Sequence, residues 1–96
     1  MLVSTLTLGA ACVSNPRPRV GVEYAMRRPP AERVEVIPAA PGSGYVWVKG
    51  HWGWRQNDYE WIAGHWAMPD RAFRDWVPGE WRHDRYGWFY VEGHWR

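Results

Sequence analysis

The C-terminal half of the chain consists of four copies of one short unit, and this repeat constrains the fold more than any other feature. Each copy has an aromatic residue, a β-branched residue, a glycine and a tryptophan in the same order. The glycines of successive copies are 14, 15 and 14 residues apart. Aromatic and β-branched residues alternate at the start of each copy, so we expect each copy to form one strand. The copies are Tyr45–Trp52, Tyr59–Trp66, Arg74–Trp81 and Trp88–Trp95.

These W-x-x-G-x-W units, two of them opened by Tyr-x-Trp, resemble the YXWGXW (WXXGXW) repeat proteins. The resemblance covers residues 45–96 and, more loosely, the lead-in at Pro38–Gly42. It implies a small exported or lipoprotein-like bacterial protein, but no particular biochemical activity. Glu80 replaces histidine in the third copy and Tyr90 replaces the first tryptophan in the fourth, so neither position is strictly required.

The segments between the copies have the composition and length of hairpin loops. They are Arg55–Asp58, Pro69–Ala72 and His83–Gly87. Strands joined by such short loops pair with their sequence neighbours. The sequence therefore predicts an all-β domain, a four-stranded antiparallel up-and-down meander preceded by a proline-rich extended segment.

Symmetric hairpins through these loops pair residues whose numbers sum to 113, 142 and 171. The pairing sets two aromatic columns across the predicted sheet. Cross-strand aromatic pairs contribute roughly 0.2–1 kcal/mol each relative to alanine pairs. The first column holds Trp47, Trp66, Trp76 and Trp95, and the second holds Trp52, Trp61, Trp81 and Tyr90.

The two tryptophans of one copy, such as Trp47 and Trp52, are five residues apart, which places them on opposite faces of a flat strand. A bulge at the glycine between them adds one residue and returns both to one face. We therefore expect bulges at the four repeat glycines. These are Gly50, Gly64, Gly79 and Gly93.

The aromatic face has two interpretations, a structural core or an exposed face that binds a partner. In a domain this small it is the only large source of apolar burial. Four strands cannot bury two aromatic columns against themselves unless the sheet coils strongly or something covers it, and an uncovered patch would exceed what soluble monomers usually expose. We expect a cover, which is either a short strand at residues 33–37, a second copy of the protein, or a ligand.

The N-terminal part differs sharply in composition. All nine tryptophans lie in residues 45–96, whereas six of the eight prolines lie in residues 1–44. The whole net charge of +2 also lies in the first 44 residues, and the repeat domain is neutral. This composition predicts an Arg/Pro-rich spacer over residues 12–44 that precedes the repeat domain of residues 45–96.

Residues 1–11 are uncharged, apolar and small, and the sequence Leu8–Cys12 resembles a bacterial lipobox. The resemblance implies a signal peptide over residues 1–11 and a lipid on Cys12. Gly9 stands where leucine is typical and no basic residue precedes the apolar run, which an upstream start codon would explain. The apolar run is too short to span a membrane. The absence of aspartate at Val13 implies the periplasmic side of the outer membrane.

Catalytic and metal chemistry find little support in the repeat domain. It has no cysteine or serine, and its aspartates Asp58, Asp70 and Asp84 lie in predicted turns, so we expect no enzyme and no cofactor. The weak basic charge also argues against nucleic-acid binding. Equivalent repeat positions supply a candidate ligand set, but its members lie too far apart across the predicted sheet to share one metal ion. That set is His51, His65, Glu80 and His94.

The sequence thus predicts a lipid-anchored cell-envelope protein with a structural or protein-interaction role. Its expected partners are the membrane, through the lipid, and an envelope protein or a glycan. A homo-oligomer formed through the aromatic face is a further expectation. The alternative function is a carbohydrate-binding or peptidoglycan-binding module that uses tryptophan and tyrosine rings as stacking platforms.

Overall fold

The computed structural model describes residues 17–70 and 72–96. Every regular element in these ranges is a strand, and the strands pair only in antiparallel fashion. The expected all-β antiparallel fold class is therefore confirmed. The strands are β1 (Val46–Val48), β2 (His51–Arg55), β3 (Asp58–Ile62), β4 (His65–Ala67), β5 (Trp76–Val77), β6 (Glu80–Asp84), β7 (Gly87–Val91) and β8 (His94–Trp95).

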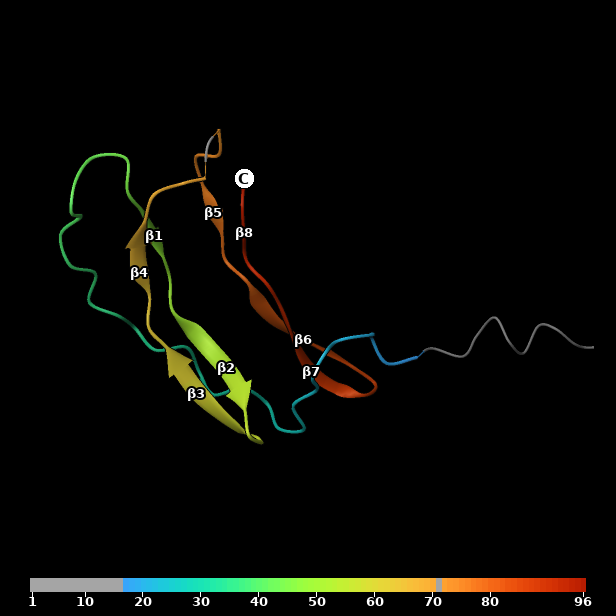
Figure 1. The fold of residues 1–96 in the computed structure, drawn as a ribbon. Helices are drawn as coiled ribbons and strands as arrows, with labels where there is room; N and C mark the ends of the chain where they lie inside the picture. Colours follow the sequence, from blue (N-terminus) through green and yellow to red (C-terminus); the bar gives the residue numbers. More distant parts are fainter. Residues whose placement is uncertain (1–16, 71) are drawn as a thin grey trace, which may run out of the picture.

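The eight strands form two long hairpins, each interrupted once (Figure 1). The first hairpin comprises β1 to β4, in which β1 pairs with β4 and β2 pairs with β3. The second hairpin comprises β5 to β8, in which β5 pairs with β8 and β6 pairs with β7. Every pair in the first hairpin sums to 113 and every pair in the second to 171, so both of these predicted registers are confirmed.

The middle pairing of the predicted meander is wrong, because no ladder joins the two hairpins. Trp66 does not pair with Trp76, nor Trp61 with Trp81, so neither aromatic column runs on across all four copies. The connection runs over residues 68–75, which is longer than a tight hairpin loop. β5 has only two residues and is followed by Pro78, which has no N–H to donate to a ladder.

The repeat glycines lie in the interruptions, but no strand gains a residue there. In the first hairpin Val48 pairs with His65 before the break and His51 with Ile62 after it, so the register is unchanged. Both strands lose the ladder over two residues each, and the expected one-residue bulge is not present. None of the four repeat glycines has a positive φ.

Glycine is needed at the breaks because there is no space for a side chain. A Cβ on Gly50 would lie 2.6 Å from the carbonyl oxygen of Ile62 and 2.8 Å from Cζ2 of Trp61. A Cβ on Gly64 would lie 2.6 Å from Cζ2 of Trp47. Each glycine thus allows a cross-strand aromatic ring to lie directly on the backbone.

The described part of the proline-rich segment is extended and forms no strand. One isolated antiparallel bridge joins Ala25 to Trp88 of β7. The short strand expected at residues 33–37 is therefore wrong, although the segment lies along the first hairpin as a cover (Figure 1). It is held by side-chain hydrogen bonds instead of a backbone ladder, since prolines at both ends deprive the chain of donors.

A closed hydrophobic core is not formed by the described residues, whose buried hydrophobic side chains are Ala25 and Phe89. All nine tryptophans are half-buried, so the rings are neither a sealed core nor a freely exposed face. No helix in the described part of the chain is long and apolar enough to cross a membrane. The predicted signal peptide and the lipidation site Cys12 lie outside the described residues.

Candidate functional site

Each hairpin carries three aromatic rungs on paired positions. In the first hairpin the ring centroids are 5.4, 5.2 and 4.7 Å apart, and all three pairs meet edge to face. This arrangement brings the positive edge of one ring to the negative face of the other. The rungs are Trp47–Trp66, Trp52–Trp61 and Trp54–Tyr59 in the first hairpin, and Trp76–Trp95, Trp81–Tyr90 and His83–Trp88 in the second.

The tryptophans of the first hairpin hold the proline-rich segment by their indole N–H groups. Nε1 of Trp52 donates a hydrogen bond of 3.0 Å to the carbonyl oxygen of Ala31. Nε1 of Trp66 donates one of 2.9 Å to the carbonyl oxygen of Pro38. The two acceptors are seven residues apart, so the aromatic hairpin grips an extended peptide at two points along its length.

Between these two points, the Glu35 carboxylate sits at the break in the first hairpin. Gly50 N–H donates to its Oε1 at 3.0 Å, while Gly64 N–H and Nε1 of Trp61 donate to its Oε2 at 2.8 and 3.2 Å. The bond from Gly64 lowers the pKa of Glu35 most; desolvation opposes the change, and the bonds from Gly50 and Trp61 add to it. The break is thus a carboxylate-binding site made of two backbone N–H groups and one indole.

Arginines of the same segment lie over the aromatic rings. The guanidinium carbon of Arg33 is 4.9 Å from the ring centroid of Trp52, and that of Arg27 is 5.3 Å from Trp54. Arg28 lies in the same way over Trp88 of the second hairpin, at 5.4 Å. These cation–π contacts place the positive charge of the spacer on the aromatic faces of the neutral repeat domain.

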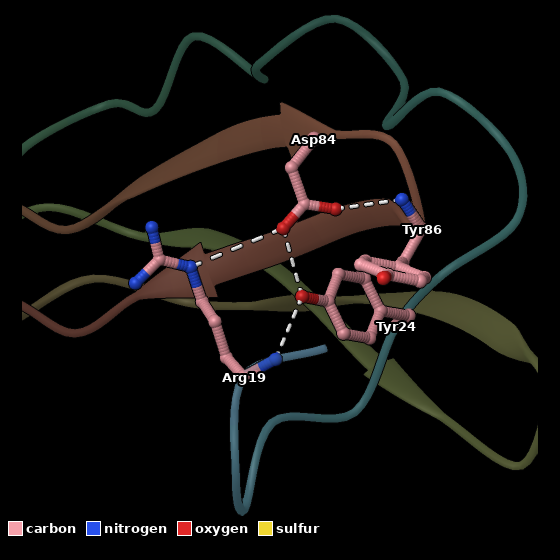
Figure 2. Close-up of polar contacts among 4 residues, drawn as sticks. All are labelled: Arg19, Tyr24, Asp84 and Tyr86. Carbon is pink, nitrogen blue, oxygen red and sulfur yellow. Dashed lines mark hydrogen bonds and ion pairs between the residues drawn. The ribbon is translucent and has the colours of Figure 1, made fainter. Parts of the chain in front are cut away.

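The start of the described segment is attached to the turn end of the second hairpin (Figure 2). The hydroxyl of Tyr24 donates to Oδ2 of Asp84 at 2.8 Å and accepts from the Arg19 N–H at 3.1 Å. Tyr86 N–H donates to the other carboxylate oxygen at 2.8 Å. Burial raises the pKa of Asp84, but the bonds from Tyr86 and Tyr24 and the charges of Arg19 and His83 outweigh it, so the net change is downward.

The two hairpins touch through side chains. His51 stacks on Tyr90 with ring centroids 4.6 Å apart, and Nε1 of Trp81 donates to the carbonyl oxygen of Trp52 at 2.8 Å. Partial burial lowers the pKa of His51, although the charge of Glu92 opposes the change. Burial also raises the pKa of Tyr90 to about 12, with Glu92 and Glu32 adding to the rise.

A pocket of about 470 Å³ lies between this contact and the proline-rich segment. Its walls include the rings of Trp52, Trp81, Trp88 and Tyr90. The volume lies in the range of small-molecule sites, and flat aromatic walls suit a flat or cyclic ligand. The segment contributes Arg28 to Glu32 to the opposite wall.

The candidate metal ligands stay apart. His51 pairs with Ile62, His65 with Val48, Glu80 with Val91 and His94 with Val77, which leaves each on a different row. In residues 17–70 and 72–96, no three histidine, cysteine, aspartate or glutamate side chains lie close enough together to hold a metal ion.

Taken together, the fold and site define a small all-β repeat protein in which paired aromatic hairpins hold an extended peptide. The model of the WXXGXW repeat matches two copies over residues 42–67, which contain the first hairpin. The match supports the resemblance to the WXXGXW repeat proteins over these residues. No curated protein and no solved structure matches it.

The residues that join the segment to the hairpins are not among those predicted from the sequence. Glu35 was expected only as part of a short strand, and Tyr24 and Arg19 were given no role. One signal was present, since Arg33 and Glu35 alternate with valines and so lie on one side of an extended chain. The charged side faces the rings, whereas Val34 and Val36 are 99% and 94% exposed, the reverse of the usual order.

Proposed function

We propose that the protein is a peptide-binding interaction module of the bacterial cell envelope, anchored through a lipid on Cys12. The aromatic hairpin serves as a receptor for extended, proline-flanked segments that carry a glutamate. The observation that carries this proposal is the binding of residues 29–38 by the first hairpin of the same chain, through two indole N–H groups and the site around Glu35.

The chemistry of that contact is transferable to a partner. It uses carbonyl oxygens, one carboxylate and arginine–aromatic stacking, none of which requires a covalent connection between segment and hairpin. Half-buried tryptophans favour such a role, because their apolar rings gain from a cover while their N–H groups need an acceptor. The segment also leaves the valines of residues 34 and 36 facing solvent.

A competition experiment tests the receptor. The Glu35→Gln chain is mixed with a synthetic peptide of residues 29–38, which contains no tryptophan, and binding is followed by the emission of the chain. We expect saturable binding that is at least about tenfold tighter than to the wild-type chain, whose own segment competes at a high effective concentration. Equal affinity for both chains, or no response in either, contradicts the proposal.

The envelope location has its own test. Wild-type and Cys12→Ala chains are expressed in a diderm host, and the membrane and soluble fractions are compared. We expect the wild-type chain in the outer-membrane fraction and the variant in the periplasm. A wild-type chain that stays soluble with an unprocessed Met1 contradicts the lipid anchor.

The aromatic pocket supports a second candidate function, the binding of a glycan or peptidoglycan fragment. Stacking of a sugar ring on Trp81 or Trp88 would quench tryptophan emission. We expect quenching by such fragments in the wild-type chain and in Trp95→Leu, whose site is outside the pocket, but not in Trp88→Leu. Emission that does not respond to any fragment removes this candidate and leaves the peptide receptor unaffected.

A further inference from the structure

The break in the second hairpin repeats the geometry of the Glu35 site. Gly79 and Gly93 occupy the positions of Gly50 and Gly64 in the repeat. A Cβ on Gly93 would lie 2.9 Å from the nitrogen of Gly79, and a Cβ on Gly50 would lie 2.8 Å from that of Gly64. The two backbone segments of the break therefore approach each other closely in both hairpins, although the roles of the two glycines are exchanged.

No carboxylate fills the second break in the described residues. Gly50 and Gly64 donate to Glu35, but the N–H groups of Gly79 and Gly93 have no acceptor within residues 17–70 and 72–96. Gly79 and Gly93 are half-buried, and a half-buried N–H group without an acceptor costs free energy. Binding of a ligand that brings an acceptor is therefore favoured. The first hairpin shows within the same chain which acceptor such a break takes.

A third donor is also retained. Tyr90 stands at the position of Trp61, and a Cβ on Gly79 would contact the Tyr90 hydroxyl. The high pKa of Tyr90 keeps this hydroxyl protonated, so it can donate as the indole of Trp61 does. Nε1 of Trp95, the equivalent of Trp66, has no acceptor in the described part of the chain, whereas Trp66 holds the carbonyl of Pro38.

The space at the second break suits a carboxylate. A pocket of about 40 Å³ is lined by Gly79, Gly93, Trp76 and Tyr90, which is more than the roughly 10–15 Å³ that a cavity needs to hold one water molecule. Glu92 and Lys49 also line it, so one negative and one positive side chain border the space. The converging donors and the charge of Lys49 favour a carboxylate there, and removal of the opposing Glu92 charge should increase the affinity.

We propose that Gly79 and Gly93 form a second carboxylate-binding site, which receives a glutamate side chain from an extended segment of a partner protein. This inference rests on the proposed peptide-binding function. The partner is a different protein, because Glu35 of any second copy is already held by its own first hairpin. The indole of Trp95 would hold a carbonyl of the same segment, as Trp66 does in the first hairpin.

Amide NMR of the ¹⁵N-labelled wild-type chain tests the site, with the peptide of residues 29–38 as the probe. In this chain the first site is filled, so we expect saturable downfield shifts of the Gly79 and Gly93 amides while those of Gly50 and Gly64 stay in place. The same peptide with Glu35→Gln should cause no shift. In a Glu92→Gln chain the affinity should rise about two- to fivefold.

The outcomes separate this site from the proposed function. Gly79 and Gly93 amides that do not move at peptide concentrations saturating the Glu35→Gln chain overturn the second site, while the first hairpin still acts as a receptor. Shifts of equal size with the Glu35→Gln peptide also overturn it, since the carboxylate is then not what binds. Shifts that appear without peptide when the chain is concentrated overturn the assignment to a different protein and identify a second copy as occupant.

Discussion

The two hairpins share the same backbone arrangement, but within residues 17–70 and 72–96 only the first holds a carboxylate at its break. Both keep a constant register, both break for two residues at paired glycines, and both stack three aromatic rungs. The break of the first hairpin holds the Glu35 carboxylate, whereas that of the second holds none in the described residues. The repeat therefore builds the binding frame, and the segment outside the repeat determines which frame is filled.

The hairpins also differ in where the N-terminal segment is attached. The first hairpin is covered at its break and along its rungs, by residues 29–38. The second is attached near its turn, where Tyr24 meets Asp84 (Figure 2). Ala25 forms a bridge to Trp88 beside this contact. The first hairpin is also held near its turn, where Arg27 pairs with Asp58 and the Arg27 carbonyl oxygen accepts from the Tyr59 hydroxyl. One segment thus contacts both hairpins and, with the direct contacts between them, holds them together without a shared sheet.

The largest effect is expected from a side chain at the breaks. Gly64→Val places a Cβ 2.6 Å from the Trp47 ring and 2.7 Å from Glu35 Oε1, and Gly93→Val places one 2.5 Å from the Trp76 ring. We expect each to lower the free energy of unfolding by about 2–3 kcal/mol, measured by urea unfolding. Gly42→Val, whose nearest contact is 3.6 Å away, is the control and should change it by less than about 0.5 kcal/mol. A neutral Gly64→Val would show that the break is not as crowded as described.

Removal of the Glu35 charge should make the first hairpin resemble the second. In the wild type, both Glu35 oxygens accept hydrogen bonds from the backbone N–H groups of the break. In Glu35→Gln one oxygen is replaced by an NH2 group, which is a donor and cannot accept, so the segment loses its central contact. We expect the hydrogen exchange of the Gly50 and Gly64 amides to rise to the rates of Gly79 and Gly93. Glu32→Gln, which breaks only the exposed pair with Lys49, is the matched control and should leave all four rates in place.

Acid should weaken both attachments of the segment. Glu35 and Asp84 have folded-state pKa values below their ordinary values of 4.5 and 3.8. A lowered pKa means that the stability each contributes is fully present above the unfolded value and is lost as the pH falls through the folded value. We expect tryptophan emission to be constant from pH 7 to about 5 and to shift to the red below pH 4 as the segment leaves the rings. A Glu35→Gln chain with the same acid profile as the wild type would contradict the role of Glu35.

The smallest effect is expected at the turns. Gln56 and Asn57 of the first hairpin have φ values of 54° and 61°, a conformation that an Asn-Gly pair adopts more easily. The double change Gln56→Asn with Asn57→Gly should stabilise the protein by about 0.5–1 kcal/mol in the same unfolding assay. Tyr86→Gly in the second turn should do the opposite, because φ is not positive there and the Tyr86 ring contacts Tyr24 at 6.0 Å.

Pairing within each hairpin could be predicted from the sequence because it depends on neighbours. The polar turn after Arg55 and the alternation of Trp52 and Trp54 are local signals. A short loop allows only one pairing register for the two strands that flank it. The same arithmetic failed between the hairpins. There the loop is longer and Pro78 follows a two-residue strand, so short loop length no longer decides the pairing.

The candidate site was predicted only in part. The aromatic residues were expected to form a core or a binding face, and the structure places them half-buried under an extended segment. The carboxylate site could not be predicted from the sequence. Glu35 lies 15 residues from one glycine and 29 from the other, and no local sequence pattern indicates that it contacts both. Its acceptor and donors meet only once the hairpin has formed.

By itself, the sequence determined the strand-forming units, their period and the register of both hairpins, since these follow from side-chain alternation and short-range loop closure. The tertiary structure alone decided that the hairpins do not share a sheet, that the glycines make room for rings, and that Glu35 lies between two N–H groups. These features join residues far apart in the chain, and their free energy comes from contacts that exist only after the backbone has folded.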